Sequence, residues 1–187
     1  MIKSKQDLAR YIEQDRLAEK RHGGAASGGV RERLNPRLRF IRNLRYYEYY
    51  HNQEKRGMWT KMMELYHYYV HKQLSYKLGF TIYANQFGPG LFIGHYGTIV
   101  INKACRIGAN CVLNVDVNIG MGGSVIGDNC YISPGAKIVK PINIGNNVVI
   151  GANAVVNKDI PANTMVAGIP AKVIKRYNEK TSKWERI

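Results

Sequence analysis

The sequence lacks any run of about 20 apolar residues, the length that a membrane-spanning helix needs, and its longest apolar runs reach only a few residues. It also lacks an apolar stretch behind Met1, so we expect no signal peptide and a cytoplasmic location. Three cysteines, an odd number, do not suit a disulfide framework. These features exclude a transmembrane protein and a disulfide-rich secreted miniprotein.

Acidic residues are also scarce, because 13 Asp and Glu stand against 28 Lys and Arg, for a formal net charge of +15. The positive charge is spread along the chain, with one dense cluster formed by Arg31, Arg33, Arg37, Arg39, Arg42 and Arg45. A basic surface attracts any polyanion, whether nucleic acid, anionic lipid or an anionic substrate. We do not expect nucleic acid as a partner. A polyanion-binding protein without catalytic activity, including one that contacts a membrane surface, remains an alternative.

Several enzyme signatures are absent: a phosphate-binding glycine loop, HExxH, CxxC and GxSxG. His67 and His71 lie four residues apart on an expected helix and could bind a metal ion together. No carboxylate or cysteine nearby completes such a set, so we expect no metal. We interpret the two histidines as surface residues among tyrosines.

The composition changes near Gly79, where long charged side chains give way to Gly, Asn, Val and Ile. We expect a helical part at 1–78, a second domain at 79–175 and a basic tail at 176–187. In the helical part, a capping box predicts a helix over 5–20. Its cap residues are Ser4 and Asp7, and its apolar side holds Leu8, Ile12 and Leu17.

A glycine-rich loop is expected at 22–30, followed by two or three helices over 36–78 with a break at Gly57. Tyrosines are frequent in these helices, at positions 46, 47, 49, 50, 66, 68 and 69. We expect them to cover a neighbouring element or a partner subunit. A base-stacking platform is the less favoured alternative, since such platforms usually lie on sheets.

The strongest signal is an internal repeat of six residues. One aliphatic residue returns in each repeat, with a single extra residue before Ile126: Ile101, Ile107, Leu113, Ile119, Ile126, Ile132, Ile138, Ile144, Ile150 and Val156. This period predicts a parallel β-helix in which each hexapeptide supplies one short strand and a turn, and three hexapeptides close a triangular coil. The aliphatic residues are expected to point inward, with glycine or asparagine in the turns.

A second repeat position, four residues after each aliphatic one, holds mainly small or branched residues. Cys105, Cys111 and Cys130 all fall in this position, so we expect buried thiols that behave as small apolar groups. A catalytic thiol would need an exposed and electropositive setting, which the inward position argues against.

His95 is the candidate for chemistry, because it stands between Gly94 and Gly97 just before the regular hexapeptides. The flanking glycines allow its imidazole to project from a tight corner. A polar ring is also poorly suited to the narrow interior of a β-helix. A structural histidine is the alternative.

Residues 79–175 resemble the left-handed β-helix domain of the serine acetyltransferase family, a branch of the hexapeptide-repeat acyltransferases. The matching segments are GHYGTIV at 94–100, VNIG at 117–120, IGANAVV at 150–156 and, most specifically, VAGIPAKVI at 166–174. The resemblance implies a mainly β fold, a left-handed parallel β-helix preceded by a small helical part. It also implies transfer of an acetyl group from acetyl-CoA to a hydroxyl group.

In this family pattern His95 corresponds to the general base, which removes the proton of the acceptor hydroxyl. The family orients this imidazole with an upstream acidic residue, but Thr81 stands near that place, at a spacing that is one residue shorter. A backbone carbonyl, Thr81 or Glu64 would then orient the ring, or the rate is lower. Thr81, Gly94 and Tyr96 are the expected substrate-binding residues, although Gly94 replaces an acidic residue of the family.

The family binds the coenzyme between adjacent subunits of a trimer, so the resemblance implies a homotrimer, which the helical parts could double. By the same correspondence, pantetheine and nucleotide would lie beside Gly122, Ala136, Ala152 and Ala154. Lys158 and Lys172 would meet the 3′-phosphate or the pyrophosphate, with solvated turn residues as the alternative.

The sequence indicates the acceptor of the acetyl group less clearly than it indicates the fold or the coenzyme. The family carries a charged insertion after the central glycines, whose arginine and histidine bind the amino-acid substrate, but here 121–124 runs directly into Val125. The helical part is also short. We therefore predict a sugar hydroxyl of a surface polysaccharide as the acceptor, with L-serine second. The missing acidic partner of His95 leaves a non-catalytic basic scaffold as a further alternative.

Overall fold

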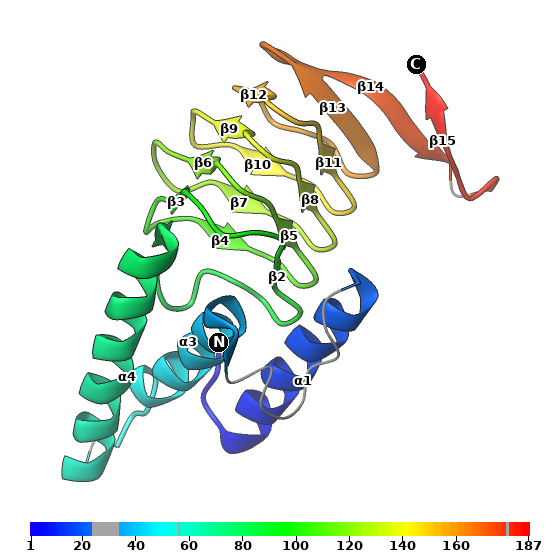
Figure 1. The fold of residues 1–187 in the computed structure, drawn as a ribbon. Helices are drawn as coiled ribbons and strands as arrows, with labels where there is room; N and C mark the ends of the chain where they lie inside the picture. The colour runs from blue at the N-terminus through cyan, green and yellow to red at the C-terminus, as the bar shows by residue number, and fades with distance from the viewer. Residues whose placement is uncertain (24–33, 56, 179) are drawn as a thin grey trace.

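The computed structural model describes residues 1–23, 34–55, 57–178 and 180–187. Within them, three α-helices occupy the first part of the chain: α1 (Lys5–Arg21), α3 (Pro36–His51) and α4 (Met58–Leu78). The helices gather at one end of a β-helix, which extends away from them (Figure 1). Most of the predicted loop at 22–30, together with Arg31 and Arg33, lies outside the described residues.

The helix ends follow from local sequence. Ser4 and Asp7 form the predicted capping box, because the Ser4 hydroxyl accepts the Asp7 N–H and the Asp7 carboxylate accepts the Ser4 N–H. Asn35 caps α3 with its side-chain oxygen. The predicted break at Gly57 is confirmed as the N-cap of α4, and Gly79 ends this helix with a left-handed φ of 77°.

The second part of the chain forms a parallel β-helix of about five coils with three faces. Face A holds β1 (Phe80–Thr81), β3 (Ile99–Ile101), β6 (Val117–Ile119), β9 (Lys137–Ile138) and β12 (Val155–Val156). Face B holds β4 (Arg106–Ile107), β7 (Val125–Ile126) and β10 (Asn143–Ile144). Face C holds β2 (Phe92–Ile93), β5 (Val112–Leu113), β8 (Tyr131–Ile132), β11 (Val149–Ile150) and β13 (Thr164–Gly168). The chain visits the faces in the order C, A, B, so each coil passes a C–A edge, an A–B edge and a B–C edge.

The six-residue repeat predicts the core correctly. All ten aliphatic repeat residues are buried, and the three cysteines are buried beside them. Among the residues four positions after each aliphatic one, Gly123 is the exception because it is exposed. The extra residue of that repeat places Ser124 in the interior instead. The side chains inside the prism form one continuous apolar cluster with the helices α3 and α4.

The turns correct one detail of the expectation. The glycines that directly follow the aliphatic residue, such as Gly108 and Gly127, do not have positive φ. They are needed because a Cβ on Gly108 would lie 2.7 Å from the Gly127 carbonyl carbon of the next coil. The left-handed turn positions come two residues later and hold Asn110 and Asn129, both with positive φ, a conformation that asparagine tolerates.

The helical part packs differently from the expectation. Leu17 is 38% exposed, so its assignment to the buried side of α1 is wrong. That side instead carries Asp15 and Glu19, which are buried because each pairs with an arginine of α3. Helix α4 also leaves apolar residues in solvent in the single chain, among them Met58, Met62, Leu65 and Tyr69.

The end of the β-helix is not a loose tail. Strand β14 (Ala171–Asn178) folds back antiparallel on β13 and continues into β15 (Lys183–Arg186), so the expected boundary at 175/176 falls inside β14. These strands lie at the end of the prism opposite the helices (Figure 1). Among the described residues, no helix combines the length and apolar character required to span a bilayer.

Candidate active site

His95 lies at the C–A edge of the first full coil, between β2 and β3, and its side chain is exposed. Backbone hydrogen bonds fix the turn on both sides of it: the Gly94 N–H donates to the Leu113 carbonyl at 2.8 Å, and the Gly97 N–H donates to the Leu78 carbonyl at 3.2 Å. The imidazole therefore projects from a held corner into solvent, as the flanking glycines predict.

The orienting group of His95 is not supplied by this chain as far as the structure describes it. No described residue makes a hydrogen bond to its imidazole. Glu64 is wrong as a candidate, because it pairs with His51 at 2.8 Å, and the rise of α4, about 1.5 Å per residue, places it roughly 20 Å from Gly79. Thr81 pairs in register with Val100 on face A and makes no described contact with the imidazole.

The two neighbours of His95 have different surroundings. A Cβ on Gly94 would lie 2.6 Å from Oδ1 of Asn114, whose amide donates to the Ile132 carbonyl. The place of the family's acidic side chain is thus occupied by an asparagine from the next coil. Tyr96 is 55% exposed, and its hydroxyl lies 3.4 Å from the side-chain oxygen of Asn35 at the start of α3.

Thr81 lines a pocket of about 330 Å³ between the end of α4 and the outer side of face A. The lining groups with polar side chains are Lys72, Ser75, Tyr76, Thr81, Tyr83 and Thr98. Lys72 is the only charged side chain among the described lining residues, and it lies 5.6 Å from the Tyr68 ring centroid. Thr98 stands three residues after His95, so the pocket begins next to the histidine corner. Thr81 could be identified from the sequence, but the lining residues of α4 could not, because only the fold brings α4 to face A.

The predicted coenzyme residues lie on two edges of face A. In the strand register, His95, Val115, Pro134 and Ala152 occupy equivalent places on the C–A edge. At about 4.8 Å per coil, Ala152 lies roughly 14 Å along the prism from His95. Lys172 pairs with Ala167 of β13, farther along this edge.

Gly122 and Lys158 are exposed on the other edge of face A, the A–B edge. Within one chain they are therefore separated from His95 by the width of that face. Ala136 and Ala154 need a correction, because both are 0% exposed and their methyl groups point into the prism. Only their backbone could meet a coenzyme.

The remaining histidines and the cysteines have structural partners. His67 bonds to the Asn43 side chain at 2.7 Å and His71 bonds to the Ile82 carbonyl at 2.9 Å, so one nitrogen of each ring is occupied by a partner within the protein. His71 is buried, which corrects its assignment to the surface, and burial lowers its pKa. For the Cys105 thiol, burial raises the pKa, because it disfavours the charged thiolate, as expected for a core cysteine.

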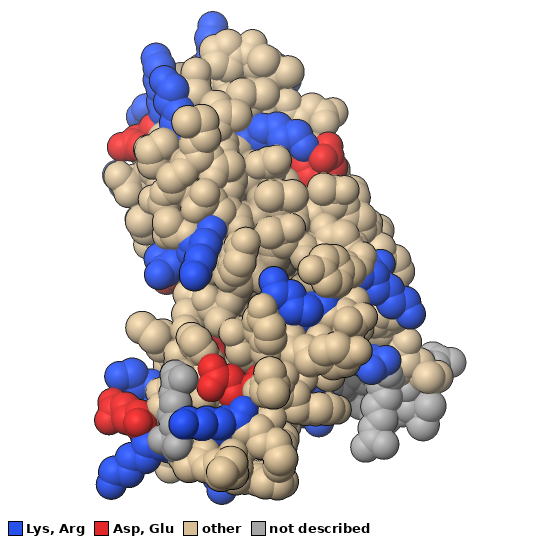
Figure 2. All heavy atoms as spheres, turned by 90° about the vertical axis from the view of Figure 1, so that its left-hand side faces the viewer, with Lys and Arg blue, Asp and Glu red and all other residues tan. Residues whose placement is uncertain are grey.

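The four arginines of the cluster that the structure describes do not form one basic patch. Arg37 and Arg45 are buried in ion pairs, while Arg39 and Arg42 line a groove between α3 and α4. On the face that carries α4, Lys and Arg occur in separate spots on a mainly uncharged surface (Figure 2). On this face, the described residues give no continuous positive surface, the feature on which the polyanion-binding alternative depends.

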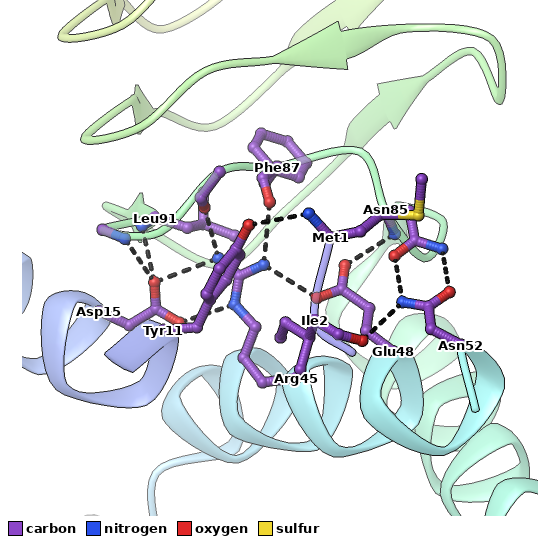
Figure 3. A network of polar contacts seen from close by, with 12 residues as sticks. Met1, Ile2, Tyr11, Asp15, Arg45, Glu48, Asn52, Asn85, Phe87 and Leu91 are labelled. Carbon is purple, nitrogen blue, oxygen red and sulfur yellow. Dashed lines mark hydrogen bonds and ion pairs between the residues drawn. The ribbon is translucent and has the colours of Figure 1, made fainter. Parts of the chain in front are cut away.

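A buried polar network joins the helices to the first coil, and the sequence analysis missed it (Figure 3). Arg45, 0% exposed, donates to Asp15, to Glu48 and to the carbonyls of Phe87 and Gly88. Asp15 in turn accepts the N–H groups of Gly90 and Leu91 at 2.8 Å each. In the sequence, the feature that indicates this network is the pair Asp15 and Glu19, four residues apart on the side of α1 that also carries Leu8.

Comparisons with known proteins agree with this architecture. The bacterial transferase hexapeptide (six repeats) family model matches residues 123–158. The serine acetyltransferase of Staphylococcus xylosus is 39% identical over 105 residues, which cover 52% of this chain and 49% of that protein. The chain thus spans about half the length of the curated relatives that it matches.

Solved structures share the fold. The serine acetyltransferase of Neisseria gonorrhoeae superposes with a TM-score of 0.73 at 22% identity, covering 96% of this chain and 71% of that chain. A serine acetyltransferase in complex with CoA gives a TM-score of 0.70 at 21% identity, covering 91% of this chain and 70% of that chain. These neighbours are left-handed β-helices, in agreement with the predicted handedness. In its repeat, its fold and its partial sequence matches, the β-helix of this chain is similar to the hexapeptide-repeat domain of serine acetyltransferases.

Proposed function

We propose that the chain is an acetyl-CoA-dependent O-acetyltransferase with L-serine as its acceptor. The observation that carries this proposal is the exposed imidazole of His95, held at the corner of a β-helix related to serine acetyltransferases. The compartment that goes with this activity is the cytoplasm.

In the proposed reaction, neutral His95 accepts the proton of the serine hydroxyl while the oxygen attacks the thioester carbonyl of acetyl-CoA. The new C–O bond forms and the C–S bond breaks. The coenzyme leaves as a thiolate and takes the proton from the imidazolium, so the products are O-acetylserine and free CoA, and His95 returns to its neutral form.

The placement of the coenzyme residues supports a cleft shared between two copies. His95, Ala152 and Lys172 follow one edge of face A, whereas Gly122 and Lys158 follow the other. In a homotrimer, the first edge of one copy would face the second edge of its neighbour and complete the cleft. The neighbour would also be the source of the group that orients the His95 ring. Contacts between the exposed sides of α4 would double the trimer.

The pocket at Thr81 is the proposed acceptor site. The Lys72 ammonium offers a partner for the serine carboxylate, and the hydroxyl groups of Thr81 and Thr98 offer hydrogen bonds. Because no acidic side chain is among its described lining residues, the serine ammonium group would need a carbonyl or a carboxylate of the neighbouring copy.

Serine replaces the sugar acceptor as the first choice, since the similar proteins named above are serine acetyltransferases and none supports a surface polysaccharide. One observation still favours a different acceptor: the turn after Gly120 is short and exposed, without the charged insertion that binds the amino acid in the family. An acceptor panel separates the two.

The deciding experiment follows CoA thiol release with purified protein, acetyl-CoA and either L-serine, sugar nucleotides or oligosaccharides. We expect turnover with L-serine and a loss of about 10²- to 10⁴-fold in kcat for His95→Ala, the usual contribution of a general base. Activity that survives this substitution rejects the base assignment, and turnover with sugars alone rejects serine. A mixture of inactive His95→Ala and Lys158→Glu copies regains part of the activity if the cleft is shared.

A further inference from the structure

Two arginines of α3 connect the helical part to the β-helix in the same way. Arg37 pairs with Glu19 of α1, and Arg45 pairs with Asp15, one helical turn earlier on α1. All four side chains are at least nine-tenths buried. Each arginine uses its remaining donors on backbone carbonyls of the first coil, but the two reach different places.

Arg45 reaches residues far from the proposed chemistry. Its guanidinium donates to the carbonyls of Phe87 at 3.1 Å and Gly88 at 2.8 Å, on the approach to β2. Arg37 reaches the histidine corner itself. Its Nη1 donates to the Ile93 carbonyl at 2.6 Å, and Ile93 is the last residue of β2, two positions before His95.

The histidine turn is held by contacts from outside its own sequence. Gly94 and Gly97 flank it, and glycine has the widest choice of backbone conformations, so the local sequence does not select one. The Ile93 carbonyl belongs to the peptide that joins Ile93 to Gly94, and rotation of this peptide would change the direction in which the following residues leave the strand. The N–H of this peptide, at Gly94, donates to the Leu113 carbonyl, and Arg37 holds the carbonyl side with a charged donor, which makes a stronger hydrogen bond than a neutral one.

Several contacts fix the position of the Arg37 side chain. Nη1 also donates to Glu19 Oε2 at 2.8 Å, and Nη2 pairs with Oε1 of the same carboxylate, which makes a two-pronged contact. The guanidinium also stacks 5.3 Å from the Phe92 ring centroid. Lysine cannot reproduce this arrangement, because it lacks the planar fork that serves the carboxylate and the carbonyl together.

We propose that Arg37, fixed by Glu19, is a positioning residue that aims His95 through the Ile93 carbonyl. The proposal rests on the function proposed above, in which His95 is the general base. Arg45, with the same chemistry on the same pair of helices, stabilises the first coil without setting the direction of His95.

The test compares Arg37→Lys and Glu19→Gln with the matched variants Arg45→Lys and Asp15→Asn. Thermal melts and sedimentation select the variants that keep the fold and oligomeric state of the unsubstituted protein at the assay temperature. Each selected variant is then measured for kcat, for KM of acetyl-CoA and for the ¹⁵N and ¹³C imidazole signals of His95, which are assigned from their absence in His95→Gln.

We expect kcat of Arg37→Lys to fall about 10- to 100-fold with KM of acetyl-CoA within about twofold, since a small misplacement of a catalytic group costs this much. In Glu19→Gln the loss should be smaller, because the amide oxygen of the introduced side chain would still accept one hydrogen bond from Arg37. The His95 signals should move in both. In Arg45→Lys and Asp15→Asn, melting temperature should fall while kcat and the His95 signals stay unchanged.

Equal effects of the Arg37 and Arg45 variants on kcat and on the His95 signals would overturn the proposal, leaving Arg37 a purely structural residue. An unchanged His95 spectrum in both Arg37→Lys and Glu19→Gln would do the same. The imidazole signals need no turnover, so they decide the role of Arg37 even if His95→Ala remains active and the proposed function fails.

Discussion

Replacement of Arg45 by methionine should destabilise the protein strongly, because the guanidinium is the centre of the network between the helices and the first coil. Arg45→Met removes the contacts to Asp15 at 2.8 and 3.1 Å and to Glu48 at 3.1 Å. It also removes the donors of two backbone carbonyls, at Phe87 and Gly88. Methionine fills most of the volume, so the loss is mainly electrostatic.

The size of the stability loss follows from the polar groups that remain buried in Arg45→Met. Two buried carboxylates remain without their cation, and breaking a buried ion pair from one side costs about 3–5 kcal/mol. Asp15 keeps the N–H groups of Gly90 and Leu91, which limits the cost of its desolvation. Each carbonyl that loses its donor adds about 1–3 kcal/mol unless water replaces it. We therefore expect a loss of at least about 3 kcal/mol in the free energy of unfolding.

The assay is urea unfolding at pH 7, followed by far-ultraviolet circular dichroism at one fixed protein concentration, because association shifts apparent stability. Arg39→Met serves as the control, since Arg39 is exposed on the same helix and should change stability by less than about 0.5 kcal/mol. A double-mutant cycle with Asp15→Asn isolates the pairwise coupling. A loss below about 1 kcal/mol for Arg45→Met would refute the central role of this network.

Three further predictions concern other parts of the molecule. Ile132→Ala should cost about 2–5 kcal/mol in urea unfolding, because Ile132 is fully buried in the prism, whereas Val139→Ala, 38% exposed, should cost little; equal losses would contradict the inward assignment. Burial lowers the pKa of His71, so its contribution to stability is complete above about pH 6.5, the ordinary histidine value, and is lost as the pH falls below it. Unfolding measured between pH 7 and pH 5 should therefore depend less on pH in His71→Gln, and an unchanged slope would count against a neutral buried ring. Glu64→Gln should leave kcat of acetyl transfer unchanged, because Glu64 bonds to His51; a large loss of kcat would return Glu64 to the list of groups that orient His95.

The β-helix could be predicted because its rules are local and repeated. Ile107, Ile126 and Ile144 recur at nearly the same spacing, and a six-residue period forces such residues to the same face of each coil. The same argument places Cys111 inside. A coil contacts only its neighbours, so the sequence of two adjacent repeats contains most of the information that determines their packing.

The helical part and the acceptor side could not be predicted in this way. Asp15 and Arg45 are 30 residues apart and meet only because α1 and α3 pack on the same coil. Helix α1 therefore buries acids where an amphipathic pattern would place Leu17. The pocket at Thr81 similarly needs the end of α4, whose direction is set by packing on Phe80 and not by a local motif.

The folded-back strands β14 and β15 also bear on why the prism has a finite length. Any coil of a solenoid is a template for another one, so two prisms could in principle join end to end into a fibre. Here one end is occupied by helices, and at the other end β14 reverses the strand direction on face C. A second prism that arrived there would meet the antiparallel pair β14 and β15 on face C in place of a regular coil, and its parallel coils could not continue all three sheets at once.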